Sequence, residues 1–317
     1  MTSPFGSTND TSGMSETQLS LLDFLLKMKS GQPPKLTPEE VDAWLKTSGR
    51  SAANLVTAAQ LLNDPELLKE AARKFPTDPR VQLEVLIKDA LPQERQQWLA
   101  AFKLSSPDNA LPNYLAARDL FKSGQPELAM QELWQAAQKP GMNTYAFDLQ
   151  QAHQSAWTAA GYPMPAAQLM SSLASQIPSI GPLNEVAGQV ADSAAKYRQG
   201  GDTASADALA VSGLTMAKRV SGGTPTIIQD LVGMGIENRF LAQMSPDSPL
   251  PGSAQTVAAR QAQLKERQQG MVTLLQSFDE TAVTRLKDED INAYFDRVHS
   301  DGGYEAMKWL HSRLDAP

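Results

Sequence analysis

The sequence predicts an all-α protein, a right-handed α-solenoid of antiparallel helical hairpins with a C-terminal helical cap. Three observations lead to this fold. Aromatic residues make up only 6% of the chain and no stretch alternates β-branched with polar residues, so strand signals are nearly absent. Apolar residues recur at helical spacing along the whole chain. Glycine-marked turns at Gly124, Gly161 and Gly201 lie 37 and 40 residues apart, which indicates a repeat.

The composition excludes several kinds of catalytic and metal-binding site. Its 317 residues allow about two domains or one elongated array. The absence of cysteine excludes disulfides, thiolate metal sites and a cysteine nucleophile, and three histidines leave little for imidazole chemistry. We therefore expect no metal and no cofactor. The net charge of −7 is spread along the chain without a basic region, so we do not expect nucleic acid as a partner.

The N-terminal segment, residues 1–35, is expected to be flexible and to contain a short amphipathic helix. Its apolar stretch runs from Leu19 to Met28, which is half the length that a bilayer span needs, and no basic stretch precedes it. We expect a cytoplasmic protein as the chain is written, or a periplasmic or envelope-associated one if a native leader or anchor was removed. As written, membrane contact is not expected.

Helix signals begin at Thr37, which can cap a helix with Pro38 in the first turn and Glu40 completing a capping box. Ser51 can cap the next helix, and a third helix is expected to end before Pro76. Each link is short, so neighbouring helices should be antiparallel. Further helices are expected near 80–90, 93–104, 109–122, 126–138, 143–160, 165–176, 183–199, 203–219 and 225–243.

A proline-rich linker at 245–253 is expected to separate the solenoid, residues 36–244, from a C-terminal helical segment, residues 254–317. Residues 254–278 are predicted to form one long polar helix, followed by helices at 289–299 and 304–314. Val257, Leu264, Met271 and Phe278 recur every seven residues on it. This face either caps the end of the solenoid or supports a weak homodimer, so a monomer or a weak homodimer is expected.

The glycine turns carry a family resemblance. Each turn glycine is followed five residues later by an alanine, at Ala129, Ala166 and Ala206. Further small residues lie two helical turns on, at Ala136 and Gly213, and Tyr197 precedes Gly201 by four residues. On these positions residues 65–220 resemble the tetratricopeptide-repeat family, and the chain is similar to helical-repeat proteins predicted in bacteria without an assigned activity. The period exceeds the usual 34 residues, and the middle repeat has Leu173 at the second small position.

The resemblance implies a protein that binds a partner peptide or helix in the groove lined by the first helix of each pair. Carried over to this chain, it places Tyr114, Arg118, Phe121 and Lys122 on that surface, with Asp192 and Arg198 in the third repeat. Cationic groups beside aromatic ones can hold a carboxylate and apolar side chains of a peptide. The alternative is a solvated helix face with Tyr114 or Phe121 packed inside.

Motifs of known enzymes are incomplete in this sequence. The acidic stretch from Asp288 to Asp296 lacks the glycine and the closing glutamate of a calcium loop. Gly233 and Gly235 resemble a dinucleotide-binding loop without its third glycine, and they fit a close helix crossing better. His153 is expected at a helix interface rather than in a metal site.

The leading hypothesis is a non-catalytic protein-interaction or scaffold module that binds a protein or peptide in the solenoid groove. An alternative is an envelope-associated assembly factor that contacts membrane or partner through Leu19 to Met28. A third hypothesis is an enzyme whose site is assembled from distant helices.

Overall fold

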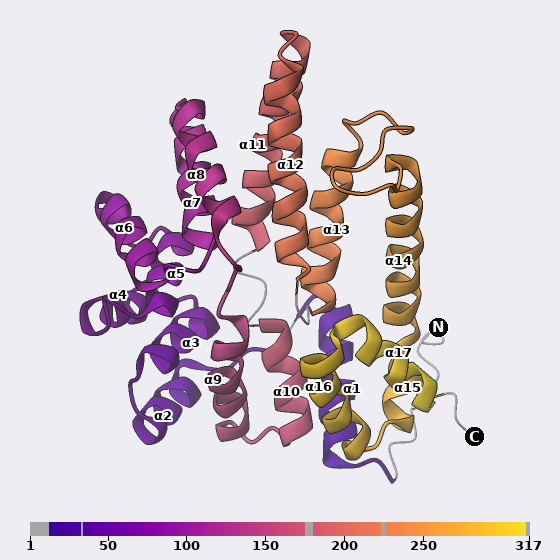
Figure 1. The fold of residues 1–317 in the computed structure, drawn as a ribbon. Helices are drawn as coiled ribbons and strands as arrows, with labels where there is room; N and C mark the ends of the chain where they lie inside the picture. Colours follow the sequence, from indigo (N-terminus) through magenta and orange to yellow (C-terminus); the bar gives the residue numbers. More distant parts are fainter. Residues whose placement is uncertain (1–12, 33, 175–179, 223–225, 315–317) are drawn as a thin grey trace, which may run out of the picture.

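The computed structural model describes residues 13–32, 34–174, 180–222 and 226–314, and within them the regular secondary structure is entirely helical (Figure 1). The predicted all-α class is confirmed: these ranges contain seventeen α-helices, one short 3-10 helix and no β-strand. None of the described helices is long and apolar enough to cross a membrane. Of the N-terminal segment expected to be flexible, residues 1–35, residues 1–12 and 33 lie outside the described ranges, and the rest contains helix α1. The helices are α1 Glu16–Lys29, α2 Pro38–Ser48, α3 Ala52–Leu62, α4 Pro65–Lys74, α5 Pro79–Lys88, η1 Pro92–Glu94, α6 Arg95–Ser105, α7 Leu111–Lys122, α8 Pro126–Gln138, α9 Ala146–Ala159, α10 Met164–Ala174, α11 Ile180–Gln199, α12 Thr203–Val220, α13 Ile227–Leu241, α14 Val257–Ser277, α15 Glu280–Arg285, α16 Asp288–Asp301 and α17 Gly303–Leu314.

Local signals determine where these helices begin and turn. Thr37 caps α2 through the predicted box, since its hydroxyl accepts from the Glu40 amide at 3.2 Å and its own amide donates to the Glu40 carboxylate at 2.7 Å. The three turn glycines adopt positive φ angles of 73°, 92° and 84°, a left-handed conformation that glycine enters without strain. The alanines five residues later, Ala129, Ala166 and Ala206, are fully buried, as close helix approach requires.

The three glycine hairpins do not stack in chain order. The first hairpin, α7–α8, packs directly against the third, α11–α12, through contacts of α7 with α11 and of α8 with α12. The middle hairpin, α9–α10, lies on the other side of the molecule, where α9 contacts α2 and α3 and α10 contacts α1 and α16 (Figure 1). The expectation of one continuous row of hairpins is therefore not met at this position.

Arg219 of α12 joins the first and third hairpins. Its guanidinium donates to the carbonyl oxygens of Ala136, Ala137 and Lys139 at the C-terminal end of α8, and also to the Tyr114 hydroxyl of α7. The last carbonyls of a helix have no partner within the helix, and a cation there also complements the helix dipole. Arg219 therefore caps α8 from a helix eighty residues further along the chain.

Small residues allow the helices next to this junction to cross closely. A Cβ atom at Gly213 of α12 would lie 2.2 Å from the Phe240 ring of α13, and one at Gly233 would meet the Ser221 hydroxyl at 1.8 Å. Gly233 thus serves the predicted close crossing, whereas Gly235 faces open space.

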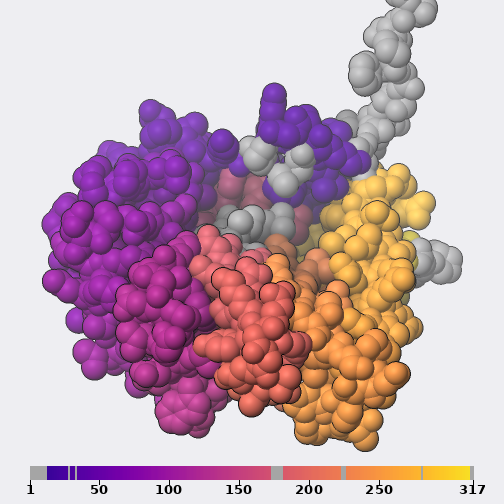
Figure 2. Space-filling model, turned by 90° about the horizontal axis from the view of Figure 1, so that it is seen from above, coloured from indigo at the N-terminus to yellow at the C-terminus, as the bar shows by residue number. Residues whose placement is uncertain are grey.

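The two ends of the chain meet in one apolar core. Leu21 and Leu22 of α1 are buried together with Val283, Ile291 and other residues of the C-terminal helices. The indigo α1 lies beside the yellow C-terminal helices in Figure 2. The N-terminal and C-terminal segments, which the sequence suggested were separate, therefore pack against each other.

The C-terminal helices are also joined firmly to the rest of the molecule. The proline-rich stretch folds back on itself, with the Leu250 amide donating to the Gln255 carbonyl at 2.8 Å and the Val257 amide to the Ser248 carbonyl at 3.0 Å. The heptad positions Val257, Leu264 and Met271 are buried in a cluster with α13 residues of the same chain. These three positions are therefore covered within one molecule, as in a cap on the end of the helical array.

A buried polar cluster fastens the displaced helix α9 to the first helices. Gln60 of α3 donates to the Glu84 carboxylate of α5 at 2.8 Å and lies 2.8 Å from Nε2 of His153 on α9. Burial lowers the pKa of His153 to about 4 and raises the pKa of Glu84. His153 therefore lies at a helix interface, as the sequence indicated, and favours its neutral form there.

We expect Arg219→Gln to destabilise the fold by about 2–3 kcal/mol, because three helix-end carbonyls lose a charged donor. Arg239→Gln is the matched control, since the exposed Arg239 donates among the described residues only to the Asn184 carbonyl at 3.2 Å. The Arg239→Gln variant should lose less than about 0.5 kcal/mol of unfolding free energy. Urea unfolding followed by circular dichroism measures both. Equal costs for the two variants would contradict the role assigned to Arg219.

The His153 pKa predicts a loss of stability in mild acid. The unfolded histidine takes up a proton near pH 6.5, while the folded one does so only near pH 4. The unfolded state thus binds more protons between these values, and stability falls as the pH falls through this window. Between pH 7.5 and pH 5 the wild type should lose about 2 kcal/mol more than His153→Gln. The raised pKa of Glu84 changes stability in the opposite direction, but Glu84 is present in both proteins, so its contribution cancels in the comparison. Equal losses of stability in the wild type and in His153→Gln would refute the prediction.

Candidate ligand-binding site

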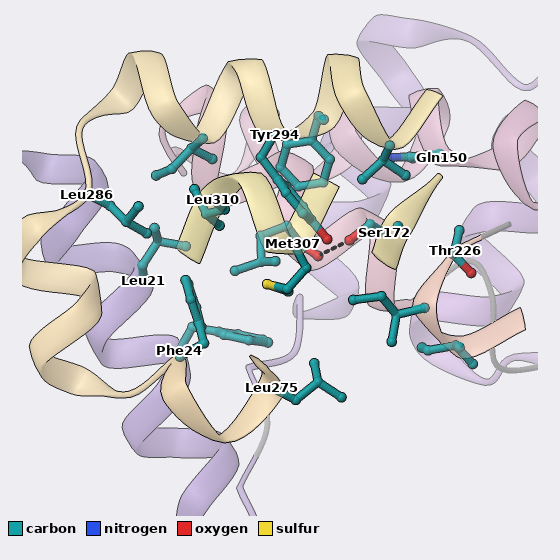
Figure 3. A pocket seen from close by; sticks show the side chains of 18 of the residues that line it. Leu21, Phe24, Gln150, Ser172, Thr226, Leu275, Leu286, Tyr294, Met307 and Leu310 are labelled. Atoms are coloured by element: carbon teal, nitrogen blue, oxygen red, sulfur yellow. Dashed lines mark hydrogen bonds between the residues drawn. The ribbon is translucent and has the colours of Figure 1, made fainter. Parts of the chain in front are cut away.

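A cavity of about 350 Å³ lies where the displaced α9–α10 hairpin, the N-terminal helix and the C-terminal helices meet. Its walls come from α1, α9, α10, α13, α14, α16 and α17, together with Leu286 at the end of α15. Figure 3 shows side chains from these elements pointing toward a common space. The cavity therefore depends on segments from both ends and from the middle of the chain.

Helix α1 supplies one wall because its apolar residues follow helical spacing. Leu21, Phe24 and Leu25 line the cavity, and the first two are 1% and 7% exposed. The start of α1 is tied to the C-terminal helices by two side chains. The Thr17 hydroxyl donates to the Asp288 carboxylate at 3.0 Å, and the Gln18 amide donates to the Leu286 carbonyl at 2.8 Å.

The displaced hairpin supplies the facing wall. Phe147 and Gln150 lie one turn apart on α9, and Leu169 and Ser172 lie one turn apart on α10. The Ser172 hydroxyl donates to the Leu169 carbonyl at 2.8 Å, as a serine often does within its own helix. Stacking α9–α10 between the other two hairpins would remove these side chains from the cavity.

A close backbone contact sets the position of α17 against α13. A Cβ atom at Gly303 would lie 2.5 Å from the Ile227 amide nitrogen, so only glycine fits at the start of α17. Further along α17, Met307 and Leu310 then face the cavity. Gly303 thus positions the part of the wall that α17 forms.

The lining is almost entirely uncharged and apolar. Among its twenty-one residues none is an acid, a lysine, an arginine or a histidine, and the polar side chains are Gln150, Ser172, Thr226 and Tyr294. Burial raises the pKa of Tyr294 to about 12, so its hydroxyl keeps its proton at neutral pH. The Thr226 hydroxyl accepts from the Gln229 amide as the cap of α13.

Two lining residues connect the cavity with the surface. Phe147 is 38% exposed and Leu275 is 42% exposed, although both are large apolar side chains. The Phe147 ring packs at 5.0 Å from the ring of His299 on α16. Both side chains therefore reach from the cavity lining to the molecular surface.

The residues that the sequence proposed for partner binding lie elsewhere, around the junction of the first and third hairpins. Tyr114 is 2% exposed, and its hydroxyl accepts from Arg219. Arg118 is also buried, bonded to Asp119 and 3.7 Å from Glu185 of α11. Because α11 packs on this side of α7, these two side chains do not form an open binding face.

The remaining proposed residues form contacts within the molecule. Phe121 is half-buried against the main core, and Lys122 is exposed and pairs with Glu185 at 2.8 Å. Arg198 donates to the Gln243 carbonyl at 2.9 Å and pairs with Asp207 at 2.7 Å. The structure brings the α7 residues together with Glu185 but places Arg198 in a different contact, so the five do not share one site.

The apolar spacing of α1 is the sequence signal for one wall of the cavity. In the alternative hypothesis the apolar stretch from Leu19 to Met28 contacts a membrane or a partner, whereas Leu21, Leu22 and Phe24 are buried inside the molecule. Among the described side chains of this stretch, only Leu19 and Leu26 are large apolar residues with more than 40% exposure. An apolar stripe shows that a helix face will be covered, but not which element covers it.

Comparisons with protein-family models, with curated proteins and with solved structures find no match to this chain.

Proposed function

We propose that the protein is a non-catalytic binding protein that holds an apolar ligand in the cavity closed by α1. The observation that carries this proposal is the cavity itself, about 350 Å³ with almost wholly apolar walls drawn from both ends of the chain. Binding sites for small molecules usually measure about 300–1,000 Å³ and are lined mainly by apolar side chains with a few polar groups.

The chemistry of the lining supports binding rather than catalysis. General acid–base catalysis needs a group that gains or loses a proton near neutral pH. The lining offers no carboxylate, imidazole or amine, and the Tyr294 hydroxyl stays protonated. Among the described residues no group of three or more potential ligands could hold a metal ion.

The proposed binding cavity is not the helix face that the family resemblance implies. We regard α7–α8 and α11–α12 as tetratricopeptide-like units, supported by their glycine turns and by the buried Ala129 and Ala206. The first helices of these units, α7 and α11, contact each other, and Tyr114 and Arg118 on α7 are buried. The displaced middle hairpin supplies the binding surface instead.

Filling the cavity should abolish ligand binding. We expect Nile red, an uncharged apolar dye, to fluoresce when mixed with the protein, and Ser172→Phe to reduce this signal at least tenfold by occupying the space. Ser300→Phe adds the same atoms to the exposed side of α16 and is the control. Thermal unfolding of each variant verifies that it is folded. Dye binding that is equal in the wild type and in folded Ser172→Phe, or absent from the wild type, would refute the proposal.

A further inference from the structure

Two polar groups of the cavity have no partner among the described residues. Gln150 is 8% exposed, and its side-chain amide makes no hydrogen bond to the described residues. The Tyr294 side chain contacts the Phe295 ring at 5.1 Å, and its hydroxyl makes no hydrogen bond to the described residues. Neither group is among the fully buried polar atoms that lack a partner, so water can reach both of them. A carbonyl or hydroxyl group of a ligand can take the place of that water.

The polar side chains of the lining lie on one side of the cavity (Figure 3), among apolar residues such as Phe147 and Ile227. In Figure 3 the labelled polar side chains Gln150, Ser172, Thr226 and Tyr294 lie toward one end of the pocket, and Leu21, Phe24 and Leu286 lie toward the other. This arrangement suits a molecule with an apolar chain and a polar head.

Charge decides the kind of head group. A carboxylate or ammonium group in this cavity would lose its water and meet no opposite charge, because the lining has none. An amide and a hydroxyl, in contrast, can satisfy an uncharged carbonyl or hydroxyl group. We infer that the ligand is an uncharged amphiphile whose apolar chain lies against α1 and whose carbonyl or hydroxyl head lies between Gln150 and Tyr294. This inference rests on the proposed function and specifies its ligand class.

Decanol, decanamide and ionised decanoate test the head group, because they share similar chains and differ in charge. At pH 8 we expect decanol and decanamide to raise the melting temperature of the full chain and to displace Nile red. Decanoate should need at least tenfold higher concentrations. Equal potency of decanoate, or displacement by none of the three while Nile red binds, would overturn this inference and leave the proposed function standing. If Nile red does not bind either, the proposed function itself fails.

Variants of the two polar residues test where the head lies. Gln150→Leu and Tyr294→Phe should each weaken decanamide binding about three- to tenfold, the effect of one lost hydrogen bond. Gln151→Leu on the exposed side of α9 and Tyr304→Phe on α17 are the matched controls and should leave the affinity within twofold. If Gln150→Leu and Tyr294→Phe, both folded by circular dichroism, bind decanamide as tightly as the controls do, the placement of the head is wrong.

Discussion

The direct junction between the first and third glycine hairpins determines the rest of the architecture. It is made by one cation, Arg219, which caps the end of α8 from α12, and by Glu185, which pairs with Lys122 across α7 and α11. Buried apolar residues of α7, α11 and α12 complete it within the largest core cluster. With these two hairpins in contact, the hairpin between them in sequence has no place in the row.

The displaced hairpin makes the binding cavity possible. Because α9–α10 leaves the row, it packs on α2 and α3 and presents Phe147, Gln150, Leu169 and Ser172 to the N- and C-terminal helices. Helix α1 then covers an apolar space instead of solvent, and the hydrogen bonds of Thr17 and Gln18 hold it there. The stacked hairpins α7–α8 and α11–α12 thus do not line the cavity. Its walls come from helices outside this stack, including α1, α9 and α10.

Local features of this fold could be predicted from the sequence, and long-range ones could not. Capping at Thr37 and Ser51, the left-handed glycine turns and the buried alanines each depend on a few neighbouring residues, and all are present. The order in which hairpins stack depends on contacts such as Arg219 with Lys139, which are eighty residues apart. Tyr114 and Arg118 share a helix face as expected, but sequence spacing does not show that α11 covers it. The cavity was missed for the same reason, since its lining comes from eight separate elements.

The distance between α8 and its neighbours tests this account most directly. The chain contains no cysteine, so paired spin labels can be attached to cysteines introduced at exposed positions. Double electron–electron resonance measures the distance between the two labels. It should be shorter for the pair Gln131→Cys and Val211→Cys, on α8 and α12, than for the pair Gln131→Cys and Met164→Cys, on α8 and α10. The opposite order would mean that the hairpins stack in chain order, and it would contradict both the junction and the cavity that depends on it.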